Sequence, residues 1–219
     1  MAGITTAMCD SYKRDLMSGL HCHNQSRTHT GTTTNGGFQV TGVSSLTGLA
    51  VGVKLSGTGI PAGTVIASID SANSYTMSKA ATAAGTPTIT SVGDTFMIAL
   101  FKVGVAGTYS RTTTNYSDMT GNSDETSGAG YTAGGQALTN VDPSLDTGTA
   151  ITDFSPDPTW TSASFSTTGC MLYNATRRGP VANQATSVHD FGGTQTVTSG
   201  TFTAVMPVPA AATAILRIA

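Results

Sequence analysis

The sequence predicts a mainly β protein whose β-sandwich or jelly-roll-like core carries one N-terminal helix and an inserted small all-β domain. Three observations predict this class. Helix-like spacing of apolar residues is confined to the start of the chain, up to Leu20. Beyond it, short runs rich in β-branched residues alternate with turns rich in Gly, Pro and Asn. These runs, of about five or six residues, recur about every ten residues, which is typical of small sandwiches and barrels.

The predicted helix runs from Thr6 to about Leu20. Its apolar side chains recur at every fourth residue: Met8, Tyr12, Leu16 and Leu20. This spacing places them in one stripe along a helix. Thr5 or Thr6 is predicted to cap the start, and Gly19 is predicted to end the helix. We expect the stripe to pack on a sheet or on a neighbouring subunit.

A change in composition after His29 predicts three segments. Residues 1–30 form an N-terminal helix and arm, residues 31–93 an inserted small β domain, and residues 94–219 the main β-sandwich domain. The N-terminal segment is expected to pack with the main domain. Five runs in the insert have strand character: FQVTGV, VGVKLS, TVIASI, SYTMS and TPTITSV.

The stretch GTGIPAGTVIASI, residues 57–69, has the glycine density of a phosphate-binding loop. Such a loop needs a Lys and a Ser or Thr directly after its last glycine, at the start of a helix. Here Gly63 is followed by Thr-Val-Ile, which favours a strand, and the third glycine of a dinucleotide fingerprint is missing. Pro61-Ala62-Gly63 suits a β-turn. We interpret the stretch as a turn between strands and not as a nucleotide site.

The main domain begins with its strongest strand signal, DTFMIALFKV, residues 94–103. Both alternating sets of side chains are apolar, which predicts a central strand buried on two sides. The stretch NYSDMTGNSDETSGAGYTAGG, residues 115–135, is predicted to be an exposed loop. Strand-like runs then resume and continue to the terminal AILRIA, which is expected to be tied into a sheet.

The composition excludes several classes of partner. Charged residues make up only 10% of the chain, against about 25% in an average globular protein. This favours a chain that works within an assembly, because charge keeps lone molecules apart. The net charge of −2 and the small Arg177-Arg178 cluster argue against a nucleic-acid or membrane partner. No run approaches the roughly 18 apolar residues that span a bilayer, and no secretory signal pattern is expected.

The cysteines and histidines do not predict a metal site. The chain has three cysteines: Cys9, Cys22 and Cys170. Without framework spacing, we expect free thiols in a reducing compartment. His21-Cys22-His23 could hold a metal, with His29 and Cys9 completing the set in space. Adjacent side chains point in different directions, however, whereas zinc needs four convergent ligands.

No enzyme is predicted either. His189-Asp190 lies among many serines, but a G-x-S-x-G elbow is missing and the alternation in TSVHDFGG favours a structural histidine. An acidic run comprises four residues: Asp142, Asp146, Asp153 and Asp157. It lacks the ligand order of a calcium loop and is interpreted as Asx-turns. Trp160 is interpreted as a core residue. The sequence therefore predicts no catalytic, cofactor-binding or metal-binding residue.

Two parts of the chain resemble bacteriophage proteins. Residues 40–86 contain a G-T-G-I-P-A-G-T turn, an I-x-S-I-D strand and an S-x-x-A-T-A-x-G-T segment. Together they resemble a small β module that recurs in phage structural proteins. The other segments are MCDSYKRDLMSGLH, GDTFMIALF, GAGYTAGGQALT, DFSPDPTWTSASFSTTGCMLYNAT and AILRIA. They are similar to a family of tailed-phage virion proteins described as virion structural, head-decoration or cement proteins.

The resemblance implies a capsid cement or decoration protein that bridges neighbouring major capsid proteins. It implies a homo-oligomer, expected to be a trimer, on the capsid surface of a virion and made in the host cytoplasm. The inserted domain would project as a knob or adhesive surface. Two alternatives stay open: a tail or head-tail component, and a receptor-binding or glycan-binding virion module. No site residue or cofactor follows from the resemblance.

Overall fold

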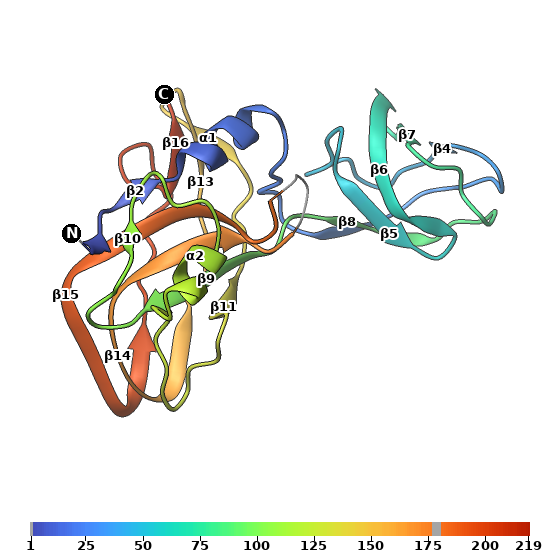
Figure 1. Cartoon of the computed structure of the whole chain (residues 1–219). Coiled ribbons are helices and arrows are strands. Elements are labelled where there is room, and N and C mark those ends of the chain that lie inside the picture. Colours follow the sequence, from blue (N-terminus) through green and yellow to red (C-terminus); the bar gives the residue numbers. More distant parts are fainter. Residues whose placement is uncertain (1, 177–180) are drawn as a thin grey trace. The chain divides into compact units, whose positions relative to one another are not determined.

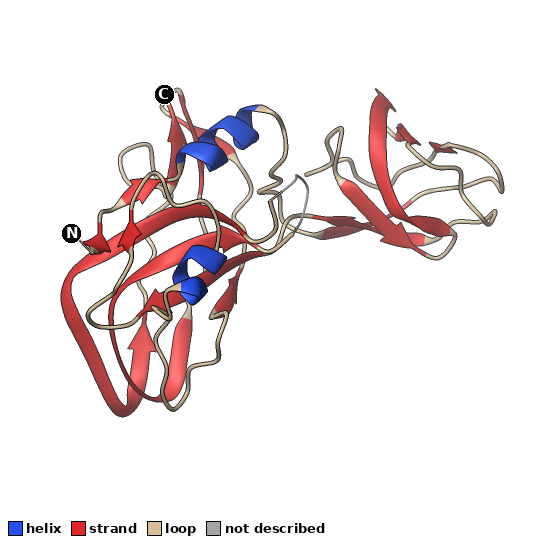
Figure 2. Ribbon diagram, viewed as in Figure 1, coloured by secondary structure: helices blue, strands red, loops and turns tan. Residues whose placement is uncertain are grey.

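The computed structural model describes residues 2–176 and 181–219, and it divides the chain into two compact units. Unit 1 comprises Met1–His21 and Asp94–Ala219, and unit 2 comprises Cys22–Gly93. Arg177-Arg178 lies outside the described residues. Strands contain 47% of the residues and helices 6%, so the predicted mainly β fold class is confirmed (Figure 2).

Unit 1 is built on a five-stranded antiparallel sheet in the order β11-β9-β14-β15-β2. Its strands are β11 (Gln136–Leu138), β9 (Phe96–Phe101), β14 (Thr159–Asn174), β15 (Gln184–Thr203) and β2 (Ala7–Met8). The long β14 and β15 lie side by side and curl together (Figure 1). Four register shifts interrupt their pairing, and such bulges increase the local twist of a sheet.

The strand β9 has the two buried faces that its sequence predicts. Phe96, Ile98 and Leu100 pack into one hydrophobic cluster with Trp160. The alternating residues of β9 belong to a second cluster, on the other face: Met97, Ala99 and Phe101. The strand lies between β11 and β14, so it is not an edge of the sheet. The five-stranded sheet therefore has an apolar core on each side.

The helix α1 (Asp10–Met17) is shorter than the predicted Thr6–Leu20. Residues Ala7–Met8 form β2 instead, because they pair with β15 at the sheet edge. The predicted cap at Thr5 or Thr6 is therefore wrong; the residue at the N-cap is Cys9, which makes no side-chain capping bond. Tertiary pairing of backbone groups overrides the apolar spacing at this end of the helix.

The predicted end of the helix at Gly19 is confirmed. Gly19 has a φ of +70°, in the left-handed region that favours glycine. Its amide donates to the Leu16 carbonyl at 3.0 Å, and the Leu20 amide donates to the Asp15 carbonyl at 2.9 Å. This pair of bonds is a Schellman motif, which satisfies the last carbonyls of a helix.

Smaller elements complete unit 1. A three-stranded antiparallel sheet has the order β12 (Ser144–Asp146), β13 (Thr149–Thr152) and β16 (Leu216–Ile218). The C-terminal run is thus tied into a sheet, as predicted. A short parallel pair joins β1 (Gly3–Ile4) and β10 (Thr108–Tyr109). The helix α2 (Ser117–Gly121) lies in the stretch predicted to be an exposed loop, and its Met119 is fully buried.

Unit 2 has six strands in the order β3-β8-β5-β6-β7-β4. They are β3 (Arg27–Thr30), β8 (Thr88–Val92), β5 (Lys54–Gly57), β6 (Ile60–Ser71), β7 (Ser74–Met77) and β4 (Gln39–Val40). All five predicted strand runs overlap one of β4 to β8. The predicted boundary at residue 31 is wrong, however, because β3 pairs with β8 along its whole length. The unit therefore begins at Cys22 and ends at Gly93.

The stretch 57–69 contains a turn between strands, but the turn is not where the sequence places it. Thr58-Gly59 connects β5 to β6, and Gly59 has a φ of +76°. Pro61-Ala62-Gly63 lies within β6 as a bulge, because the register shifts between Leu55 and Gly57 on the partner strand. The Thr64 hydroxyl closes this bulge by donating to the Pro61 carbonyl at 2.6 Å. Gly59 and Gly63 therefore supply the positive φ angles of the turn and of the bulge.

Candidate functional site

Unit 1 contains a cavity of about 540 Å³ between one face of the five-stranded sheet and the C-terminal segment, residues 204–217. Ile98 of β9 and Leu172 of β14 contribute apolar lining from the sheet. Met206 and Ile215 contribute apolar lining from the C-terminal segment. Small-molecule sites commonly have this size and a largely apolar lining with a few polar groups.

The polar groups of the cavity include Ser187 and His189, which share one face of β15 because they are two residues apart. The Ser187 hydroxyl lies 2.9 Å from Nε2 of His189. Burial lowers the pKa of His189, which favours the neutral imidazole at neutral pH. The sequence placed His189 on one face of a strand, and the structure confirms that placement while adding the cavity.

Asp190 does not complete a hydrolase triad with these two residues. Its Oδ1 accepts the Gly192 amide at 2.9 Å, and its own amide donates to the Thr6 hydroxyl at 2.9 Å. A triad needs a carboxylate on the second ring nitrogen of the histidine. The arrangement of Ser187 and His189 suits hydrogen bonding to a ligand within the cavity.

The acidic run does not line the cavity, but it holds the C-terminal segment that does. Three of its carboxylates accept backbone amides from the C-terminal segment: Asp146 from Ala211 at 2.7 Å, Asp153 from Ile215 at 3.1 Å, and Asp157 from Met206 at 2.9 Å. The interpretation as Asx-turns is therefore wrong for these residues, because these partners lie about 50 to 65 residues away. The one local bond, from the Phe154 amide to Asp153, spans one residue and not the two of an Asx-turn. Burial raises the pKa of Asp153.

The residues considered for a metal do not form a cluster. Among the described residues, no group of three or more His, Cys, Asp or Glu side chains could hold a metal ion. His21, at the end of unit 1, packs edge-on against Tyr12 and bonds to Asn174 at 2.8 Å. His29, in unit 2, bonds to the Tyr75 hydroxyl at 2.9 Å. Cys9 is fully buried in the core.

Trp160 is a core residue, as the sequence predicts. Only 2% of it is exposed. Its ring packs edge-on against Phe165 and at a tilt against Phe202, and it stacks on Tyr131. Trp160 belongs to the same apolar cluster as the cavity residues Leu172 and Met206.

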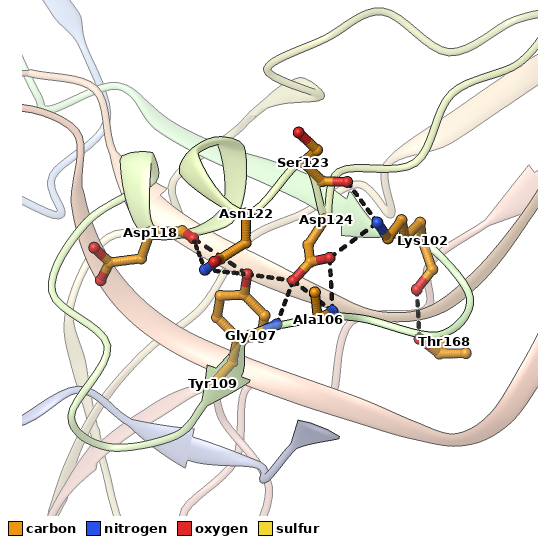
Figure 3. Close-up of polar contacts among 9 residues, drawn as sticks. All are labelled: Lys102, Ala106, Gly107, Tyr109, Asp118, Asn122, Ser123, Asp124 and Thr168. Atoms are coloured by element: carbon orange, nitrogen blue, oxygen red, sulfur yellow. Dashed lines mark hydrogen bonds and ion pairs between the residues drawn. The ribbon is translucent and has the colours of Figure 1, made fainter. Parts of the chain in front are cut away.

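The carboxylate of Asp124 is the most heavily bonded side chain in the stretch predicted to be an exposed loop. It is fully buried, and it accepts the amides of Ala106 and Gly107 at 2.8 and 2.7 Å (Figure 3). The Tyr109 hydroxyl donates to it at 2.7 Å, and the Lys102 ammonium lies 3.1 Å away. Burial alone would raise the pKa of Asp124, but these donors hold it below its usual value. The network fixes the loop that follows β9.

Glu125 organises the opposite side of the same segment. Its carboxylate accepts the hydroxyls of Tyr116 and Tyr131 and, at 2.7 Å, the Gly134 amide. The Tyr131 hydroxyl also accepts the Leu100 amide at 2.9 Å. No apolar alternation marks residues 124–126 in the sequence, so local patterning could not reveal this segment. The only trace of this segment in the sequence is the adjacent pair Asp124-Glu125. In an extended chain such neighbours point to opposite sides, as these two do.

The cysteines lead to a testable prediction. All three are free thiols. Burial raises the pKa of both Cys9 and Cys170 to about 12, so almost no reactive thiolate forms at pH 8. We expect a chromogenic disulfide reagent to modify only the half-buried Cys22 in the native protein, and all three thiols in urea. The native Cys22→Ser variant should not react with the reagent. Reaction of two or more thiols in the native wild-type protein would contradict the burial of Cys9 and Cys170.

No helix among the described residues has the length and apolar character needed to cross a membrane. Comparisons of the chain with protein-family models, with curated proteins and with solved structures find no match.

Proposed function

We propose that this chain is a virion structural protein of a tailed phage that binds the capsid surface as a cement or decoration protein. Its partners are then the major capsid protein and further copies of the same chain, with a trimer as the expected oligomer. The support comes from the resembling segments, from the 10% charge content, and from one feature of unit 1. That feature is a set of exposed apolar side chains near its C-terminus.

These side chains define the C-terminal apolar surface: Leu145, Val205, Val208 and Ile218. Leu145 is 77% exposed and Ile218 is 57% exposed, and both lie directly opposite Ala150 across β13. Directly opposed residues share a face of a sheet, so they form one row. Val205 and Val208 lie on the C-terminal segment, whose Ala211 amide bonds to Asp146. Asp146 follows Leu145 in β12, so this bond lies on the other face of the sheet from the row.

Covering this surface would stabilise an assembly. Fully burying one Leu, Ile or Val side chain contributes about 1.5–3 kcal/mol. Leu145 and Ile218, which share one row, therefore offer apolar area for a contact, less the cost of association. The C-terminal apolar surface is the observation on which the proposal depends most.

The test is binding to expanded capsids that lack the protein. We expect the purified chain to bind them and to raise their melting temperature. Val208→Asp and Leu145→Asp should each weaken binding about tenfold, because a charge would be buried in the contact. Val103→Asp is the matched control, since Val103 is also exposed in unit 1 but lies outside the C-terminal apolar surface.

Failure to bind capsids, or equal effects of all three variants, would overturn the proposal. Fractionation of disrupted virions tests the remaining structural alternative, because a tail or head-tail component would be found with the tails and not with the heads. Hundreds of copies per virion are expected for a capsid-lattice protein, against a handful for a tail or portal protein.

A second candidate role, receptor or glycan binding by unit 2, has one observation in its favour. A polar pocket of about 410 Å³ is lined by Arg27, His29 and hydroxyl side chains that include Ser45 and Thr47. Hydroxyls beside a guanidinium can hydrogen-bond a sugar. This role predicts retention of the protein on host cells or surface polysaccharide, lost when unit 2, residues 22–93, is deleted.

A further inference from the structure

We propose that the cavity of unit 1 binds a small organic carboxylate with an apolar body, such as a medium-chain alkyl or aryl acid. The proposal concerns a ligand site and does not depend on the capsid role. It is carried by the size of the cavity, by the chemistry of its lining and by the position of its polar groups.

The size of the cavity sets the size of the ligand. A water molecule occupies about 30 Å³ of liquid, so about 540 Å³ holds roughly 18 water-sized atoms. Ile98, Leu172, Met206 and Ile215 line it, and Phe191 adds an aromatic ring. These side chains offer water no hydrogen bonds, so an apolar body is favoured over water against this part of the wall.

The polar groups select a carboxylate head. Arg217 lines the cavity and is exposed to solvent, and among the described residues its guanidinium bonds only to the Ala212 carbonyl. It forms no ion pair with a described carboxylate, so its other N–H groups can bind a carboxylate in a fork. Ser187 and neutral His189 add a hydrogen-bonding pair without a competing charge.

One lining residue carries a negative charge that would repel an anionic ligand. Asp190 also borders the cavity, and its carboxylate is exposed to solvent and bonded to the Gly192 amide. Solvent screens such an exposed charge. Removing it should therefore strengthen carboxylate binding modestly, which distinguishes a carboxylate ligand from an uncharged one.

The experiment follows the histidine ring signals by NMR while octanoate is added to the full chain below its micelle-forming concentration. The chain has four histidines, and only His189 lines the cavity. We expect one of the four signals to shift saturably, and His189→Gln to remove that signal. Acetate, which lacks the apolar body, and 1-octanol, which lacks the charge, should both bind more weakly.

Arg217→Gln should weaken octanoate binding about fivefold and leave octanol binding unchanged. Arg111→Gln is the matched control, because Arg111 is an exposed arginine of unit 1 that does not line the cavity. Near-ultraviolet circular dichroism checks that each variant is folded. The proposal is overturned if no histidine signal shifts at millimolar octanoate, if a histidine outside the cavity shifts instead, or if Arg217→Gln and Arg111→Gln behave alike.

Discussion

Asp124→Asn is expected to lower the stability of unit 1 by about 3 kcal/mol, and its melting temperature by about 9 °C. The wild-type carboxylate is fully buried and accepts two amides and a phenol hydroxyl beside Lys102. An asparagine has only one acceptor oxygen, so at least one buried donor loses its partner and the Lys102 charge loses its counter-ion. Fluorescence of Trp160, the only tryptophan and a residue of unit 1, reports the unfolding.

The effect of Asp124→Asn should depend on pH. The folded-state pKa of Asp124 lies below its ordinary value near 3.8, so its contribution is present above that value. It is lost as the pH falls through the lower, folded-state pKa. The gap in urea midpoint between wild type and variant should therefore be constant near neutral pH and should narrow only below about pH 4.

Asp157→Asn is the control for this prediction. Asp157 is exposed and accepts a single amide, from Met206, which an asparagine oxygen can also accept. We expect a change within about 0.5 kcal/mol. Equal losses in the two variants would show that the buried network around Asp124 contributes no special stability.

Gly135→Ala is expected to destabilise unit 1 by about 4 kcal/mol. Gly135 has a φ of +75°, and a Cβ there would overlap the Ile98 carbonyl oxygen and lie 2.9 Å from the Cα of Ala99. Both neighbours are backbone atoms of β9, so the chain must move away from the central strand. The pairing of Gln136 with Ile98 would be lost with it.

Gly134→Ala provides a matched comparison, because Gly134 also has a positive φ, of +92°. Its added Cβ would meet only the Tyr173 hydroxyl, at an ordinary 3.5 Å. Backbone strain alone should cost about 1 kcal/mol. Comparing the free energies of unfolding of both variants in urea separates the cost of backbone strain from the cost of the close approach to β9. Similar losses at the two glycines would mean that the chain does not approach β9 as closely as described.

Local sequence patterns were sufficient to predict the structure wherever interactions between neighbouring residues determine it. The alternation in residues 96–101 predicts a strand with two apolar faces, and both faces are buried. Gly19 ends the helix because only a few backbone atoms, all within five residues, take part in the motif. The density of turns between β-branched runs predicts the mainly β class for the same reason.

The candidate site could not be predicted in this way. His189 could be placed on one face of a strand, but the cavity beside it exists only because residues 204–217 return over the sheet. The acidic run and the stretch 115–135 look like solvated loops by composition. Their carboxylates are instead the hydrogen-bond acceptors that hold distant backbone in place.

The sequence by itself determined the mainly β class, the central strand β9, the end of the helix and the presence of an inserted β unit. Only the tertiary structure decided that Ala7–Met8 form a strand, that unit 2 begins at Cys22, and which donors reach Asp124 and Asp153. The physical reason is the distance along the chain over which the interactions act. Alternation and turn chemistry act between neighbours, whereas a buried carboxylate is satisfied by whichever amides the fold brings to it, for Asp153 one that lies 62 residues away.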